Sequence, residues 1–292
     1  MRVSSLSIVI AATLATPSSS YASDVVAVMS SRLEPYQEAL NGFEKAFGAE
    51  VPALDLGDSR GGIKQTTKVV VAFGSRAAAQ LYPAHALLVY CMAPGVRLSK
   101  VSGGKQSIRI SMTPPASTIL RKIKILQPRL HRLGFLWISD NQEAFNQEML
   151  AAAHKTGIEL LSHRLSNTDE LPDQLRVLHA QHAEALWVPP DPQLLTPDNF
   201  NVMRTFSRSS RIPFYVANEG FVEKGATAAI AISFQEIGRS AARVARKILE
   251  GNFDGTEAYP DKVVLVVSEQ AAAETGLDLT AEARQQVDKV MP

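Results

Sequence analysis

The sequence predicts an α/β protein with two Rossmann-like lobes, each built around an open parallel sheet. Short, uniformly apolar runs alternate with segments of helical periodicity along almost the whole chain. Strands without polar alternation are buried on both faces, which is typical of a parallel sheet covered by helices. The pattern gives about nine or ten strands, more than one doubly wound sheet comfortably holds in a chain of 292 residues. Two sheets, and hence two lobes, are therefore expected.

The first 22 residues differ from the rest of the chain. Arg2 is their only charged residue, Leu6 to Ala15 form an apolar run, and the segment ends in small residues at Ala22. This pattern is typical of a secretory signal peptide, and we expect cleavage after Ala22. A transmembrane anchor is the alternative, but it needs about 20 apolar residues, roughly twice the length present. We therefore expect a mature protein in the periplasm that is not embedded in the membrane.

The composition is that of an ordinary globular protein, with 46% hydrophobic and 20% charged residues. Loss of Arg2 with the signal peptide would leave 29 basic and 29 acidic residues. A chain without excess positive charge lacks the electrostatic footprint of a protein that binds nucleic acid or an anionic membrane. The single cysteine, Cys91, follows an apolar run and is predicted to be a buried thiol rather than a reactive one.

The individual elements follow from the periodicity. In the predicted helix 35–47, Tyr36, Ala39 and Phe43 recur at helical spacing and form an apolar face, and Pro35 suits the first turn. The predicted strands are 24–29, 68–73, 86–91, 133–138, 158–162, 184–189, 213–217, 226–232 and 262–267, and the further helices are 75–80, 117–126, 143–155, 172–180, 197–206 and 234–250. A proline pair within 111–117 interrupts the alternation and marks a candidate boundary between lobes.

Gly74 and Ser75 follow the apolar run Val69 to Phe73 and could serve chemistry or structure. A serine-hydrolase elbow needs the pattern G-x-S-x-G, which occurs nowhere in the chain. The stretch from Gly57 has Walker glycine spacing but carries Ile63 where the lysine belongs, and the full dinucleotide-binding glycine pattern is absent. We expect Gly74 to form a tight turn and Ser75 to cap the following helix, either as a cap alone or with an added contact to a small anion.

Metal binding is not predicted. Among the six histidines, His179 and His182 share a helix face, but a third ligand, Glu184, comes only after the helix ends. We expect no metal and no cofactor. No paired nucleophile and base can be named either, so we do not expect an enzyme.

Polar side chains recur just past the predicted strands. In open α/β sheets, ligands bind beyond the carboxyl ends of the strands, so a site would be drawn from these positions. Each residue taken alone is more often a helix cap or turn residue than a ligand contact. The set comprises Ser30, Ser31, Glu34, Asp140, Asn141, Asp191, Asn218 and Glu219.

Several segments together carry a resemblance to a known family. They include "VVVAFGSRAAAQ", "LGFLWISDNQEAFNQEMLAAAHKTGIEL" and "ALWVPPDPQLL". The block from Ile212 to Asn252 is the most telling, with a strand, an acidic turn, a "KGA" strand and a long helix ending in glycine. The mature chain resembles the periplasmic solute-binding proteins of ABC importers with the type I fold, in particular the branch that includes tryptophan- and tyrosine-binding members.

The resemblance implies two lobes that are joined by three crossovers and close over a ligand like a hinge. It places the first lobe at 23–112 and about 220–258, and the second at 113–219 and about 259–292, after the signal peptide at 1–22. A ligand carboxylate would meet the helix start at Ser75, an ammonium would meet Asp191 or Glu219, and an aromatic body would stack on Tyr36 or Phe145. The full implied set is Ser30, Ser31, Tyr36, Gly74, Ser75, Asp140, Phe145, Asp191, Glu219 and Phe234.

The function implied is capture of a small polar or aromatic, amino-acid-like solute and its delivery to the membrane permease of an ABC importer. The alternative is a periplasmic sensor partner with the same fold, which binds a protein or a signal ligand without import. We expect a monomer, whose partners are a small-molecule ligand and either the permease or a sensor protein.

Overall fold

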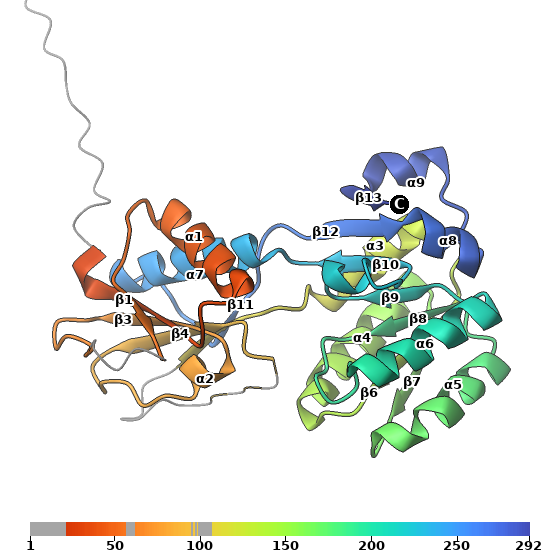
Figure 1. Cartoon of the computed structure of the whole chain (residues 1–292), viewed down its shortest axis with the longest axis horizontal. Helices are drawn as coiled ribbons and strands as arrows, with labels where there is room; N and C mark the ends of the chain where they lie inside the picture. Colours follow the sequence, from red (N-terminus) through yellow and green to blue (C-terminus); the bar gives the residue numbers. More distant parts are fainter. Residues whose placement is uncertain (1–21, 57–61, 95, 97, 99–106) are drawn as a thin grey trace, which may run out of the picture.

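The computed structural model describes residues 22–56, 62–94, 96, 98 and 107–292. The predicted signal peptide therefore lies outside the described residues, apart from Ala22 in a short turn, η2 (Ala22–Asp24). Two α/β lobes lie side by side and are connected by extended chain segments (Figure 1). The predicted fold class, two lobes with largely parallel sheets, is confirmed.

The first lobe contains a six-stranded parallel sheet in the order β11-β5-β4-β3-β1-β2. Its central strands β1 and β3 are buried at every position, which explains why their sequences are uniformly apolar. The strands are β1 (Val25–Met29), β2 (Ala53–Asp55), β3 (Val69–Phe73), β4 (Leu87–Cys91), β5 (Ser107–Ile110) and β11 (Glu257–Ala258).

Two helices cover one face of this sheet. They are α1 (Glu34–Phe47) and α7 (Phe234–Leu249), which lie far apart in the sequence and pack directly on each other. A Cβ atom at Gly238 would lie 1.8 Å from the backbone oxygen of Ala39, so only glycine allows this close approach. The short helix α2 (Ser75–Ala78) contributes Ala77 and Ala78 to the core on the other face.

The second lobe contains a seven-stranded sheet in the order β13-β12-β10-β9-β8-β6-β7. All neighbouring strands are parallel except β10 and β12, which are antiparallel. The strands are β6 (Arg132–Trp137), β7 (Glu159–Arg164), β8 (Ala185–Val188), β9 (Phe214–Val216), β10 (Ala228–Ala231), β12 (Val264–Ser268) and β13 (Lys289–Met291).

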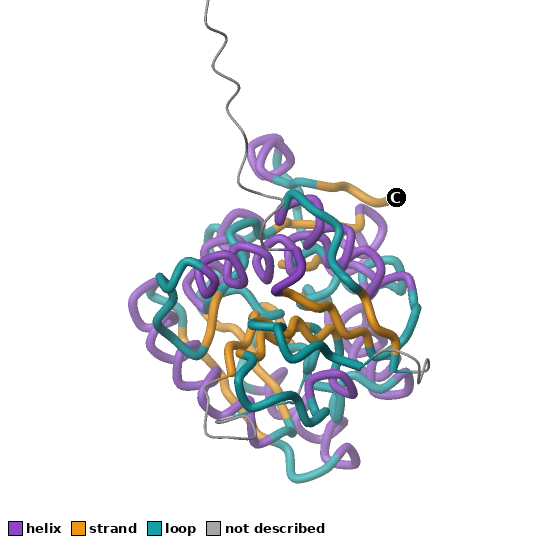
Figure 2. The backbone as a smooth tube through the Cα atoms, turned by 90° about the vertical axis from the view of Figure 1, so that its left-hand side faces the viewer, coloured by secondary structure: helices purple, strands orange, loops and turns teal. Residues whose placement is uncertain are grey.

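Helices cover both faces of the second sheet, and Figure 2 shows helices around the strands as seen from the side of the first lobe. On one face, α3 (Ala116–Leu126) and α4 (Glu143–Thr156) bury an apolar core that includes two tryptophans. On the other face, α5 (Leu171–Ala180) and α6 (Pro197–Ser210) bury a second core. The remaining elements are η3 (Asp140–Gln142), η4 (Thr168–Glu170), η5 (Glu219–Phe221), α8 (Glu269–Thr275) and α9 (Ala281–Gln286).

Within the described residues, the chain passes between the sheets at 111–115, 232–233 and 259–263. The second of these positions corrects the predicted boundary near residue 220. β10 pairs with β9 and with β12, so residues up to Ala231 belong to the second sheet rather than to the first lobe. The predicted boundary was early because the acidic turn after β9 is a loop within the second lobe, not a linker.

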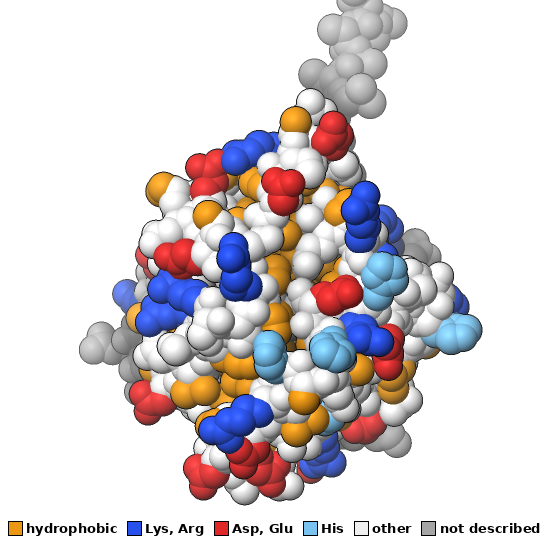
Figure 3. Space-filling view, turned by 90° about the vertical axis from the view of Figure 1, so that its right-hand side faces the viewer, with side chains coloured by type: hydrophobic (Ala, Val, Ile, Leu, Met, Phe, Trp, Pro, Cys, Tyr) orange, Lys and Arg blue, Asp and Glu red, His pale blue; other side chains and the backbone are white. Residues whose placement is uncertain are grey.

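The outer end of the second lobe carries basic and acidic side chains interspersed around an apolar strip (Figure 3). None of the helices within the described residues is long and apolar enough to cross a membrane.

Candidate ligand-binding cleft

The lobes meet where the carboxyl ends of strands from both sheets face each other. Two cavities at this junction are lined by residues of both lobes. The smaller has a volume of about 30 Å³ and lies between the ends of β4 and β5 and the loops that follow β6 and β8. The larger has a volume of about 100 Å³ and lies between β5, β11 and the start of α4. Together the two cavities form the part of a candidate cleft that lies next to the crossing segments 111–115 and 259–263.

Arg109 in β5 lines both cavities. Its guanidinium forms an ion pair with Glu257 of β11, and both side chains are largely buried. Thr113 and Gln142 also line both cavities, from the first crossing segment and from η3 respectively. The junction therefore offers a guanidinium, a carboxylate and neutral polar groups at one place.

Asn141 provides the most specific feature of the smaller cavity. Its carboxamide oxygen Oδ1 is buried and has no hydrogen-bond partner among the described residues. A buried acceptor without a donor costs about 1–3 kcal/mol of stability, so such groups usually serve a purpose. A solute that donates an N–H or O–H group at this position would satisfy Asn141.

The first lobe brings Ser30, Tyr36 and Gly74 together at the carboxyl ends of β1 and β3. Gly74 has a φ of 99°, and a Cβ atom there would lie 2.4 Å from the Ser30 Oγ and 2.8 Å from a Tyr36 ring carbon. The predicted tight turn at Gly74 is therefore present. Tyr36 is half-buried against the core of its own lobe, and none of Ser30, Ser31, Tyr36, Gly74 and Ser75 lines either interlobe cavity.

The predicted cap of α2 is corrected in one respect. Gly74 occupies the N-cap position, and Ser75 is the first helical residue. The capping oxygen comes from Ser30, whose Oγ accepts a hydrogen bond of 2.9 Å from the backbone N–H of Ala77. The Ser75 hydroxyl is thus not the cap. Ser31 lies beside this group and is half-buried.

Asp191 plays a different role from the predicted one. Its side chain is fully buried, and Oδ2 accepts hydrogen bonds from the backbone N–H groups of Ile138 and Ser139, at 2.8 and 2.9 Å. Oδ1 accepts from the Ser139 hydroxyl, at 2.5 Å, and from the N–H of Gln193, at 3.0 Å. Both oxygens are occupied, so Asp191 holds the loops after β6 and β8 together and has no accessible oxygen for a ligand ammonium.

The other predicted residues of the second lobe lie at different depths. Asp140 is exposed and forms an ion pair with Arg164. Phe145 lines the larger cavity and also packs into the core, with its ring centroid 6.2 Å from that of Phe135. Glu219 lies in η5, where it pairs with Lys289 at 3.4 Å, and it lines neither interlobe cavity.

Phe234 is the first residue of α7, just after the second crossing. Its ring is half-buried against the first-lobe core and it lines neither interlobe cavity.

Several cavity residues were missed as site candidates from the sequence. Ser111 and Thr113 follow β5, and Arg109 lies within it. This segment was not predicted to be a strand, so the rule that sites lie past strand ends could not find them. Gln142 and Glu148 lie at and beyond the turn that was singled out at residues 140–141.

Cys91 lines the smaller cavity, but its thiol is buried, and burial raises its pKa well above the ordinary value. The Sγ atom lies 3.7 Å from the backbone oxygen of Ala72. Cys91 is thus a neutral, structural side chain. Within the part of the chain that the structure describes, no cluster of three His, Cys, Asp or Glu residues could hold a metal ion.

Comparison with known proteins decides the family. A family model described as ABC transporter substrate binding protein matches residues 110–290, more than half of the chain. The chain belongs to this family. The "Tyrosine-binding protein" of Clostridioides difficile (strain R20291) is 24% identical over 157 residues, which cover 53% of this chain and 43% of that protein. The chain therefore matches less than half the length of this relative.

Solved structures of similar fold cover nearly the whole chain. One is an ABC domain in complex with L-Trp from Streptococcus pneumonia, with a TM-score of 0.62 and 18% identity over 91% of this chain and 99% of that one. Another is the ligand-free, open structure of a substrate binding protein with adhesive properties from Clostridium difficile, with a TM-score of 0.66 and 17% identity over 91% and 98% of the two chains. Both similarities confirm the type I periplasmic binding protein fold.

The description of this family points to solute binding as part of an ABC transporter. The family match favours this function over the alternative of a sensor partner.

Proposed function

We propose that the protein captures a small polar or aromatic, amino-acid-like solute between its lobes, outside the cytoplasmic membrane, and delivers it to the permease of an importer. The observation that carries this proposal is the pair of cavities lined by both lobes, the smaller of them lined by Asn141, whose buried Oδ1 has no partner among the described residues. A solute that contacts both lobes favours the closed arrangement, because only that arrangement offers both sets of contacts.

The polar groups suit an amino acid. Asn141 Oδ1 is a hydrogen-bond acceptor for an ammonium group, the role that Asp191 cannot fill. On the opposite lobe, the hydroxyls of Ser31 and Ser75, both half-buried, are donors for a carboxylate. Tyr36 and Phe145 offer aromatic rings to a flat side chain. The relatives that bind tyrosine and L-Trp make aromatic amino acids the first candidates.

Melting temperatures in the presence of a ligand panel test the capture function. The panel comprises L-tryptophan, L-tyrosine, the other amino acids, purines, sugars and carboxylates. A solute present at 100 times its dissociation constant is expected to stabilise the protein by about 2.7 kcal/mol. If no member of the panel raises the melting temperature of the ligand-free protein, capture of an amino-acid-like solute is wrong.

The variant Asn141→Leu tests the assigned contact. Leucine has nearly the same shape but no acceptor, so the affinity for the stabilising solute should fall about tenfold. The stability of the ligand-free protein should not fall, because a buried unpaired oxygen has been removed. Asn201→Leu, an exposed site on α6, is the matched control and should leave affinity unchanged. Equal affinity in both variants would show that Asn141 does not contact the solute.

The proposed location and delivery can be tested separately. Export with cleavage after Ala22 predicts a mature chain that begins at Ser23, which an intact mass of protein from the periplasmic fraction would show. Delivery to a permease predicts uptake of the solute that is lost when the gene for this chain is deleted. We propose that the mature protein is a monomer, which light scattering after gel filtration would measure.

A further inference from the structure

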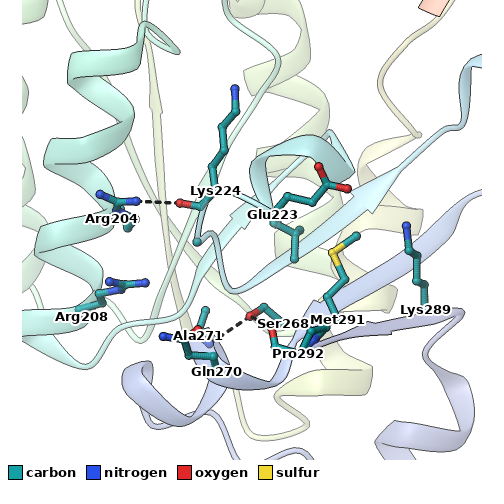
Figure 4. A pocket seen from close by; sticks show the side chains of 12 residues that line it. Arg204, Arg208, Glu223, Lys224, Ser268, Gln270, Ala271, Lys289, Met291 and Pro292 are labelled. Carbon is teal, nitrogen blue, oxygen red and sulfur yellow. Dashed lines mark hydrogen bonds between the residues drawn. The ribbon is translucent and has the colours of Figure 1, made fainter. Parts of the chain in front are cut away.

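A third and larger cavity lies in the second lobe, lined by that lobe alone. Its volume is about 530 Å³, within the range of small-molecule pockets. It opens between α6, the loop after η5 and the ends of β12 and β13 (Figure 4). None of the residues that line it also lines either interlobe cavity.

Basic side chains dominate the lining of this cavity. Arg204 and Arg208 project into it from neighbouring turns of α6 (Figure 4), and Lys224 and Lys289 come from the loop and from β13. Glu223 is the acidic residue among the described lining residues. The carboxylates of Glu274 and Glu219 pair with Arg208 and Lys289, whereas Arg204 and Lys224 have no carboxylate partner among the described residues.

The two arginines are fixed in place without using all of their donors. Arg204 donates one hydrogen bond of 2.9 Å to the backbone oxygen of Lys224, and the Arg208 Nε lies 2.7 Å from a Glu274 carboxylate oxygen. A guanidinium has five N–H donors. Two like charges four residues apart on a helix repel each other, and an anion between them would relieve this repulsion.

The loop at Gly225 packs against the side chains of Arg204 and Arg208. Gly225 has a φ of 101°, and a Cβ atom there would lie 2.9 Å from the Arg204 side chain and 3.1 Å from an Arg208 nitrogen. The absence of a side chain at Gly225 therefore lets both arginine side chains pack closely against the loop backbone. Ser268 and Gln270 add neutral polar groups on the opposite wall.

We propose that this cavity binds a small molecule through a phosphate or sulfate group. We call it the α6 pocket, because Arg204 and Arg208 of α6 line it. The planar guanidinium forks match the geometry of such an oxyanion, which accepts two parallel hydrogen bonds from each arginine. The site is separate from the solute cleft, and its occupation does not depend on which solute the cleft captures.

Amide chemical shifts of the mature protein during titration with sodium phosphate test this proposal, with sodium chloride at equal ionic strength as reference. We expect saturable shifts at Gly225 and Ala271, which line the α6 pocket, and none at Thr113 or Asn141, which line the cleft. Glycerol 3-phosphate in a parallel titration separates a phosphate ester from free phosphate. The cavity volume predicts tighter binding of the ester. Shifts of equal size in chloride, or shifts confined to the cleft, would overturn the proposal.

Three variants assign the contacts. Arg204→Gln is expected to weaken phosphate binding about tenfold, as is usual for the loss of a charge-assisted hydrogen bond. Arg204→Lys keeps the charge but loses the planar fork, so its affinity should lie between those of the wild type and Arg204→Gln. Arg121→Gln on α3 makes the same charge change on the other face of the sheet and should bind phosphate like the wild type. Unchanged affinity in Arg204→Gln, with its fold intact by circular dichroism, would show that the α6 pocket is not an oxyanion site.

Discussion

The side chain of Asp191 shows how one buried residue shapes the candidate cleft. Four donors from the loops after β6 and β8 converge on its two oxygens. These loops carry Asn141, Gln142 and Pro190, which line the smaller interlobe cavity. Asp191 thus acts on ligand binding through the position of its neighbours and not through direct contact.

Replacement of Asp191 with alanine should destabilise the protein. Three backbone N–H groups and one hydroxyl would lose their acceptor in a buried place, so we expect a loss of about 3 kcal/mol or more in the free energy of unfolding, measured in urea. If Asp191→Ala had wild-type stability but bound no solute, this structural role would be wrong. The result would then support the direct contact between Asp191 and the ligand that the sequence predicted.

Buried acids with raised pKa values predict loss of stability in alkaline solution. Burial raises the pKa of Cys91 and of Tyr215 above their ordinary values of 9.0 and 10.0. In the unfolded chain both groups lose their protons near these ordinary values, so above about pH 9 the unfolded state binds fewer protons than the folded state. The free energy of unfolding should therefore fall as the pH rises above about 9.

Urea denaturation between about pH 7.5 and about pH 10.5 measures this effect. Cys91→Ala removes one of the two groups and should give a shallower fall above about pH 9 than the wild-type chain. A free energy of unfolding that stays constant over the whole range would contradict the assignment.

The sequence located individual residues less well than the region in which they lie. Asn141 was in the set of polar residues past the strands, and the structure places it in the cleft. Asp191 was in the same set, but only the folded loops show that its oxygens are already occupied. Hydrogen bonds between residues about fifty positions apart leave no local pattern, so the sequence could not separate these two cases.

At the scale of elements, long apolar patterns were predicted well and short edge strands were not. The buried strands β1, β3 and β6 have short, almost wholly apolar sequences, which predict buried strands directly. β2 and β11 have three and two residues and form because a neighbouring strand offers backbone partners. Because β5 was also missed, so were Arg109 and the cleft residues that follow it.

Helix α1 lies near the start of the sequence and α7 near its end, and the two helices pack on each other in the first lobe. Gly238→Ala should disrupt this contact, because the new Cβ atom would lie 1.8 Å from the Ala39 backbone oxygen and the helices would have to separate. We expect a loss of about 3 kcal/mol in the free energy of unfolding, although alanine is intrinsically the better helix former by about 1 kcal/mol.

Gly62→Ala is the control for this prediction, because no atom lies within 4 Å of the added Cβ. Its free energy of unfolding should change by less than about 0.5 kcal/mol. If Gly238→Ala were as stable as this control, the close helix contact would not matter for folding.

At the scale of the whole molecule, two lobes followed from the number of strands, but the path of the chain between them did not. The crossing at 232–233 has no distinctive composition, unlike the segment 111–117, where a proline pair marked a candidate boundary. Strand pairing decides the matter, because β10 joins the second sheet through both of its neighbours. The same topology places α7, the helix that follows, against the sheet of the first lobe.

The central claim is that a solute is held by both lobes at once. Amide hydrogen exchange tests it directly, measured with and without the panel member that gives the largest rise in melting temperature. We predict slower exchange on both sides of the cleft, at 91–93 in the first lobe and at 139–142 in the second. Slower exchange in only one lobe, or only around the α6 pocket, would contradict the claim.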